Sequence, residues 1–116
     1  MPDLIDRATI DPSVDVFTLI NTFHTSRERQ KSIVESLQRF TEDIALDLPG
    51  FIGASVHVSL DGARVVNYVQ WRSKADLEAM MALPGAKANM AEVAALADLI
   101  DPAPYNVAFV GVRQTS

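Results

Sequence analysis

Two carboxamides and one indole interrupt apolar rows in this sequence, where their side chains could act on a bound ligand. Asn67 and Trp71 lie in the segment VVNYVQW, whose alternate residues share a side if the segment is a β-strand. Asn21 interrupts another apolar row in the segment FTLINTF. An amide does not ionise near neutral pH, but it donates and accepts hydrogen bonds, and an indole donates through its N–H. Held in an apolar pocket, such groups could stabilise an oxyanion.

The order of the predicted elements indicates how these side chains meet. Strand patterns cover residues 14–23, 51–60, 64–71 and 105–112, and residues 101–104 are expected to form a loop. One helix is expected to begin at Thr25 or Ser26, and another at Ser73, with an interruption at Pro84-Gly85 and a continuation to about residue 99. The order βαββαβ predicts a ferredoxin-like α+β fold, in which a four-stranded antiparallel sheet carries the helices on one face.

The hairpin between the second and third strands predicts the register. If Asp61-Gly62 is a two-residue turn, Val56 lies opposite Asn67, and Ile52 lies opposite Trp71. These residues would then face the helices together with Ala54 and Val58, while Phe51, Ser55 and His57 would face the other way. A slip of one residue would exchange the two faces.

Each of these polar residues also has an ordinary structural explanation. Asn67 could bond to the backbone or to Tyr105, and Trp71 could be a core residue whose N–H reaches a carbonyl. The topology favours a ligand site, because the first strand lies antiparallel to the third and brings Asn21 toward them. Asn67 and Trp71 are about 13 Å apart along a strand, so their side chains could frame a planar ligand.

Composition excludes several classes of function. The chain has 116 residues, 48% of them hydrophobic, which suits one domain over residues 14–116 after an N-terminal tail of residues 1–13. The net charge of −5 argues against nucleic-acid binding, and the absence of cysteine excludes disulfides and thiol catalysis. The two histidines lack metal-ligand spacing. With no membrane span and no secretory signal expected, we predict a cytoplasmic protein.

The sheet face turned away from the helices is expected to carry apolar residues such as Val66 and Tyr68. Because such a face would be bare in a monomer, the sequence predicts a face-to-face homodimer.

The segment DGARVVNYVQWRSKADLEAM, together with Pro49-Gly50-Phe51, resembles the antibiotic biosynthesis monooxygenase family. The likeness is strongest to the type that oxidises polyketide anthrones in the actinorhodin and nogalamycin pathways. The resemblance implies a dimeric α+β barrel with a cavity between sheet and helices in each subunit, and oxygenation without flavin, haem or metal. It also implies catalytic roles for Asn21, Asn67 and Trp71.

A substrate-binding set can be predicted around these three residues. The resemblance places Leu77 where the actinorhodin-type enzyme has a ligand-contacting tyrosine, and Lys87 near the place of an arginine. Met81 (or its neighbour Met80) and Met90 would suit a flat aromatic ligand, and Phe17 belongs to the row of Asn21. His57 matches a family histidine, although the predicted register turns it toward the dimer face.

We therefore expect a cofactor-independent monooxygenase that uses O₂ to oxidise a polyketide anthrone or related (hydro)quinone to a quinone. Its partners would be a small aromatic substrate, O₂ and a second copy of the chain. Two alternatives remain open, namely a small-quinol monooxygenase acting in catabolism or stress and a non-catalytic dimer that binds small molecules. Haem degradation on this fold uses a histidine in the second helical region, and no histidine follows His57.

Overall fold

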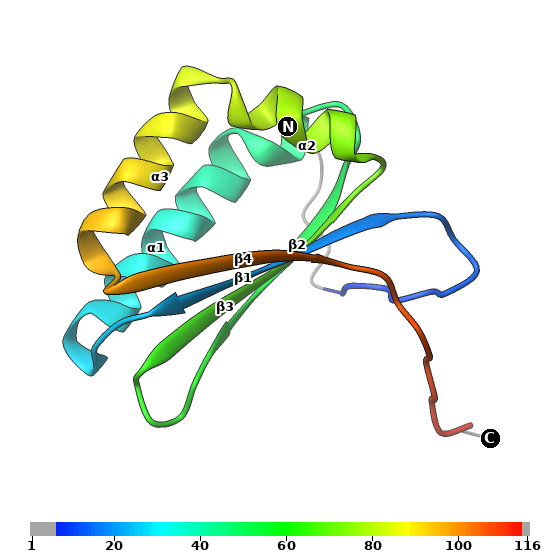
Figure 1. The fold of residues 1–116 in the computed structure, drawn as a ribbon, viewed down its shortest axis with the longest axis horizontal. Coiled ribbons are helices and arrows are strands. Elements are labelled where there is room, and N and C mark those ends of the chain that lie inside the picture. The colour runs from blue at the N-terminus through cyan, green and yellow to red at the C-terminus, as the bar shows by residue number, and fades with distance from the viewer. Residues whose placement is uncertain (1–6, 115–116) are drawn as a thin grey trace.

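A four-stranded antiparallel sheet with its helices on one face forms the body of the chain (Figure 1). The computed structural model describes residues 7–114, so residues 1–6 of the predicted tail lie outside the described residues. The elements are β1 (Phe17–His24), α1 (Arg27–Asp43), a short 3-10 helix η1 (Ala45–Asp47), β2 (Phe51–Val58), β3 (Arg64–Trp71), α2 (Lys74–Met81), α3 (Pro84–Leu96) and β4 (Leu99–Tyr105). The strand order β2-β3-β1-β4 confirms the predicted ferredoxin-like α+β fold. No helix within residues 7–114 is long and apolar enough to cross a bilayer.

The predicted register of the β2–β3 hairpin is confirmed over most of its length, with Val56 opposite Asn67. The predicted turn is too short, however. The Ser59 N–H donates to the Arg64 carbonyl, and the Gly62 N–H donates to the Ser59 carbonyl, so the loop spans residues 60–63. Gly62 adopts a φ of +78°, which favours glycine. Because the loop gains one residue on each side, the pairing does not shift.

The start of β2 corrects one prediction. Trp71 pairs with Phe51 and not with Ile52, because the register shifts at a bulge between Phe51 and Gly53. The extra residue turns Ile52 outward, where it is 49% exposed. It turns the Phe51 ring toward the helices, edge-on to the Trp71 indole at a centroid distance of 5.3 Å. The predicted faces of Phe51 and Ile52 were therefore exchanged.

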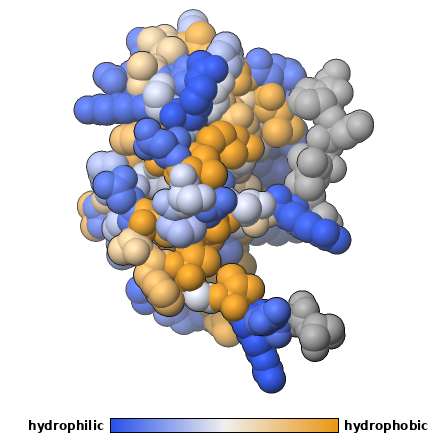
Figure 2. Space-filling model, turned by 90° about the vertical axis from the view of Figure 1, so that its right-hand side faces the viewer, coloured by the Kyte–Doolittle hydropathy of each residue, from blue (hydrophilic) through white to orange (hydrophobic). Residues whose placement is uncertain are grey.

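The last strand also differs from the prediction, since β4 covers the expected loop and ends at Tyr105. Pro102 and Pro104 lie on this edge strand opposite Asn21 and Leu19. Proline lacks an N–H, and an edge strand tolerates that loss where the nitrogen faces away from its neighbour, which alternate positions allow. Residues 106–114 form no strand and extend away from the sheet (Figure 1). Apolar surface gathers in a band at this end of the molecule (Figure 2), and Phe109 and Val112 of the tail are exposed.

Both predicted helix starts are confirmed. Of the two caps expected for the first helix, Ser26 is the N-cap of α1, and the Thr25 hydroxyl instead donates to the Leu96 carbonyl at 2.7 Å. Ser73 caps α2 as predicted, accepting the Asp76 N–H at 3.2 Å. The next helix, α3, begins at Pro84 itself, because proline suits the first helical position.

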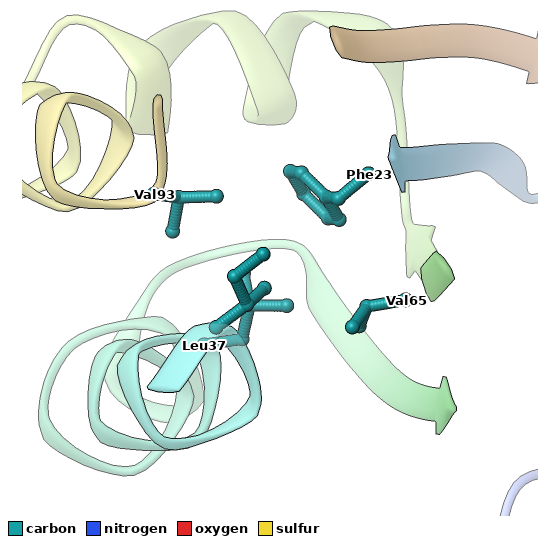
Figure 3. Close-up of a cluster of buried hydrophobic side chains, with 5 residues drawn as sticks. Phe23, Leu37, Val65 and Val93 are labelled. Atoms are coloured by element: carbon teal, nitrogen blue, oxygen red, sulfur yellow. The ribbon is translucent and has the colours of Figure 1, made fainter. Parts of the chain in front are cut away.

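The core consists of two apolar clusters between the sheet and the helices. In the first, Phe23 and Val65 point from the strands toward Leu37 and Val93 on the helices (Figure 3), and Ile33 completes the cluster. The second consists of Val69, Trp71 and Leu77. Burial of such side chains contributes roughly 1.5–3 kcal/mol each relative to exposure. The two clusters hold the helices on the sheet at either end of the site described below.

Gly50 offers a test of the turn that leads into β2. Its φ is +80°, and a Cβ added there would lie 2.2 Å from the Asp76 carboxyl carbon. We expect Gly50→Ala to lower the free energy of unfolding by about 1–3 kcal/mol, measured by urea denaturation.

Gly53→Ala is the matched control, because an added Cβ there meets no atom within 4 Å. We expect it to change stability by less than about 0.5 kcal/mol. Equal effects of the two substitutions would contradict the described turn.

Candidate active site

A cavity of about 420 Å³ lies between the sheet and the helices. Its walls are mostly apolar, with residues from β1, β2 and β3 on one side and from α1, η1, α2 and α3 on the other. The volume lies within the range of about 300–1,000 Å³ that is typical of small-molecule sites. The fold therefore encloses a pocket that suits an apolar ligand of a few fused rings.

Asn21, Asn67 and Trp71 all line this cavity. Asn21 and Asn67 are direct cross-strand partners, and Trp71 lies four residues beyond Asn67 on the same side of β3. The structure thus brings together the three residues that interrupt the apolar rows of the sequence.

Two buried polar atoms at the cavity have no hydrogen-bond partner among the described residues. They are the Oδ1 atom of Asn67, an acceptor, and the Nε1 atom of Trp71, a donor. Tyr105, which the sequence offered as a partner for Asn67, pairs with Thr18 and so belongs to the other sheet face. Leaving a buried polar group unpaired costs about 1–3 kcal/mol, so these atoms are candidates for hydrogen bonds to a ligand. A third such atom, the Thr18 hydroxyl, lies on that other face.

The predicted substrate-binding residues divide into two groups. Leu77, Met81 and Met90 line the cavity, as do Met80 and Lys87. Phe17 does not line it. Phe17 pairs with Trp71 and packs, partly buried, against the cluster of Val69, Trp71 and Leu77. The cavity reaches along β1 only as far as Leu19.

Thr41, Phe51 and Asn89 are among the lining residues that were not predicted from the sequence. The Asn89 amide nitrogen donates to the Ser36 carbonyl at 3.1 Å and to the Ser36 hydroxyl at 2.9 Å. The spacing of Ala86, Asn89 and Val93, which share one side of α3, was a signal for this position, since it places an amide within an apolar helical stripe. Phe51 required knowledge of the bulge, which the sequence does not reveal.

The cavity lining contains neither a carboxylate nor an imidazole, and Lys87 is its charged residue. His57 lies on the opposite sheet face, where its Nε2 atom is 2.7 Å from the Ser55 hydroxyl. Within residues 7–114, no cluster of three or more His, Asp or Glu side chains is arranged to hold a metal ion. The polar groups of the lining are thus amides, the indole, the Thr41 hydroxyl and one ammonium group.

An ion pair next to the cavity anchors α2 beside Trp71. Arg72 donates two hydrogen bonds of 2.9 Å to Asp76, and the Ser73 hydroxyl donates a third. The bonds from Arg72 and then from Ser73 lower the pKa of Asp76 below its ordinary value. The carboxylate therefore remains charged at neutral pH, and its contribution to stability is lost only as the pH falls through the lowered pKa.

Comparison with known proteins defines the class. Residues 16–92 match the antibiotic biosynthesis monooxygenase family, and this range contains every residue that lines the cavity except Val93 and Ala94. Over 77 residues the chain is 51% identical to the tetracenomycin-F1 monooxygenase of Streptomyces glaucescens, covering 66% of this chain and 69% of that protein. The chain belongs to the antibiotic biosynthesis monooxygenase family, and it is a monooxygenase.

Solved structures share the fold at low identity. A putative antibiotic biosynthesis monooxygenase from Nitrosomonas europaea superposes with a TM-score of 0.72 at 16% identity, covering 81% of this chain and 91% of that one. SnoaB, a cofactor-independent oxygenase from Streptomyces nogalater, superposes with a TM-score of 0.63 at 20% identity, covering 88% of this chain and 97% of that one.

The unpaired amide oxygen of Asn67 is expected to lower the stability of the fold, so its removal should stabilise the protein. We expect Asn67→Leu to raise the free energy of unfolding by about 1 kcal/mol, because it removes a buried acceptor without a partner. The midpoint of thermal unfolding, followed by circular dichroism, should rise by several degrees.

Asn89→Leu is the control for this measurement. It removes an amide that is hydrogen-bonded to Ser36, so we expect the midpoint to fall. A lower midpoint for Asn67→Leu would show that its amide is paired in the folded protein.

Proposed function

We propose that this monooxygenase uses O₂ to oxidise a polyketide anthrone, or a related (hydro)quinone, to a quinone without a cofactor. The observation that carries the proposal is the unpaired acceptor of Asn67 and the unpaired donor of Trp71, on two residues that line an apolar cavity together with Asn21. The names of the relatives support it, since one acts on tetracenomycin F1 and another is a cofactor-independent oxygenase.

The apolar walls would bind the aromatic rings of the substrate. Met80, Met81 and Met90 contribute flexible, polarisable side chains, which suit contact with a flat ring system. The substrate can then orient only through the few polar atoms of the lining. Asn67 Oδ1 would accept a hydrogen bond from a substrate hydroxyl, and Trp71 Nε1 would donate one to a substrate oxygen.

The polar groups would act by stabilising charge on the substrate. An anthrone has an acidic C–H bond, and loss of this proton leaves an enolate whose charge is spread over its oxygen and the rings. Amide and indole donors that are already oriented in a site shielded from water would favour the anion, by a few kcal/mol per donor as in other enzymes. Since no carboxylate or imidazole lines the cavity, the proton would pass to water at its open side.

The substrate anion would supply the electrons for oxidation. It transfers one electron to O₂, and the resulting radical and superoxide combine to form a C–O bond. After protonation, the hydroperoxide loses water as its remaining C–H bond breaks, which leaves a quinone carbonyl. One O₂ is consumed and one water is released for each anthrone, so no external reductant is required.

Substitutions at the three polar residues test the proposal. We expect Asn67→Ala, Trp71→Phe and Asn21→Ala each to lower kcat/KM at least about tenfold, because each removes a group that orients the substrate or contacts the developing anion. Oxygen uptake with an anthrone, in buffer treated with a chelator, measures the rate.

Asn106→Ala removes a carboxamide from the tail outside the cavity and should leave the rate unchanged. Full activity in Asn67→Ala and Trp71→Phe would refute the assignment. Loss of wild-type activity in the presence of the chelator would refute cofactor independence.

The open sheet face would bind a second copy of the chain. Ile20 and Tyr68 are cross-strand partners on this face, and Val66 lies beside them opposite Thr22. These side chains are partly exposed in the single chain, because no helix covers this face of the sheet (Figure 1). Burying such a patch favours association.

A charged residue on this face should separate the copies. We expect Val66→Glu to convert a dimer to a monomer in size-exclusion chromatography with light scattering, because pairing would bury a carboxylate. Glu78→Gln, on exposed α2, should leave the mass unchanged. A monomeric wild-type chain would refute the pairing.

A further inference from the structure

Asn89 brings a polar group to the cavity from the helix side. It lies on α3, whereas Asn21, Asn67 and Trp71 lie on strands. The cavity therefore has polar atoms on two opposing walls, with apolar side chains between them.

The orientation of the Asn89 amide follows from its partner. The backbone carbonyl of Ser36 can only accept a hydrogen bond, so the amide nitrogen and not the oxygen must face it. The same nitrogen is within hydrogen-bond distance of the Ser36 carbonyl and of its hydroxyl oxygen. The Oδ1 atom points the other way, and within residues 7–114 no hydrogen bond reaches it.

The surroundings of Ser36 make this orientation rigid. Ser36 is 1% exposed and does not line the cavity, so water does not compete for its oxygens. The amide nitrogen joins α3 to α1, and the oxygen of the same amide is left as an acceptor at a partly buried position of the cavity lining.

We propose that Asn89 determines substrate specificity by accepting a hydrogen bond, through Oδ1, from a hydroxyl on an outer ring of the substrate. This inference rests on the proposed function and narrows its substrate class to hydroxylated polycyclic aromatics. A substrate with a carbonyl or carboxylate at this point would place two acceptors together, which is unfavourable. Lys87, two residues away, cannot provide the same selection because an ammonium group only donates.

The test uses anthrones that differ by a single hydroxyl. The parent compound is unsubstituted, and a set of positional isomers carries one hydroxyl on an outer ring carbon remote from the carbonyl, where it forms no internal hydrogen bond. For the wild type, we expect at least one isomer to exceed the parent in kcat/KM by about three- to tenfold, as a neutral hydrogen bond would produce. No preference for any isomer would overturn the proposal.

Substitution of Asn89 then assigns the preference. In Asn89→Leu the preference should fall to about one, because KM rises more for the hydroxylated isomer than for the parent. Ser36→Ala, which keeps the backbone carbonyl, should retain it. Asn89→Met provides the same test if the leucine variant does not fold.

Equal losses for both compounds in Asn89→Leu would show a purely structural role and overturn the proposal, as would a preference that persists. Binding can be measured separately, because quenching of Trp71, the single tryptophan, reports occupancy of the cavity. If the wild type binds these compounds but oxidises none, the proposed function fails, and the same ratio of affinities still decides the role of Asn89.

Discussion

The antiparallel pairing of β1 with β3 is the constraint on which the site depends. These two strands form the centre of the sheet, and their register places Asn21 directly opposite Asn67 with Trp71 further along the same side. A shift of one residue between the two strands would turn one carboxamide to the open face and leave the other in place. The pairing of the strands therefore aligns the polar groups that line the cavity.

The two apolar clusters make it possible to keep polar atoms unpaired between them. Phe23, Val65 and Val93 belong to one cluster, and Trp71 and Leu77 belong to the other. Their burial offsets the cost of leaving the Asn67 acceptor and the Trp71 donor without partners. Trp71 serves both purposes, since its ring is core while its N–H is available to a ligand.

Local patterns predicted most of the fold and less of the site. Alternating apolar residues, the turn near Gly62 and the cap at Ser73 predicted the order of elements and the side on which Asn67 lies. The position of the last strand was predicted wrongly. Its prolines are typical of a loop in local sequence, but an edge strand such as β4 accommodates them. Thr25 was one of the two expected caps of the first helix, but its hydroxyl bonds to the carbonyl of Leu96, which is distant in sequence.

The sequence by itself determined the strand alternation, and with it the common side of Asn67 and Trp71, because side-chain direction in a strand follows from position alone. Only the tertiary structure decided what surrounds them. The bulge that turns Phe51 onto Trp71 and the contact of Asn89 with Ser36 arise from packing between distant segments. The same packing leaves a cavity where the unpaired atoms of Asn67 and Trp71 lie, and no local pattern shows whether a buried polar atom will find a partner.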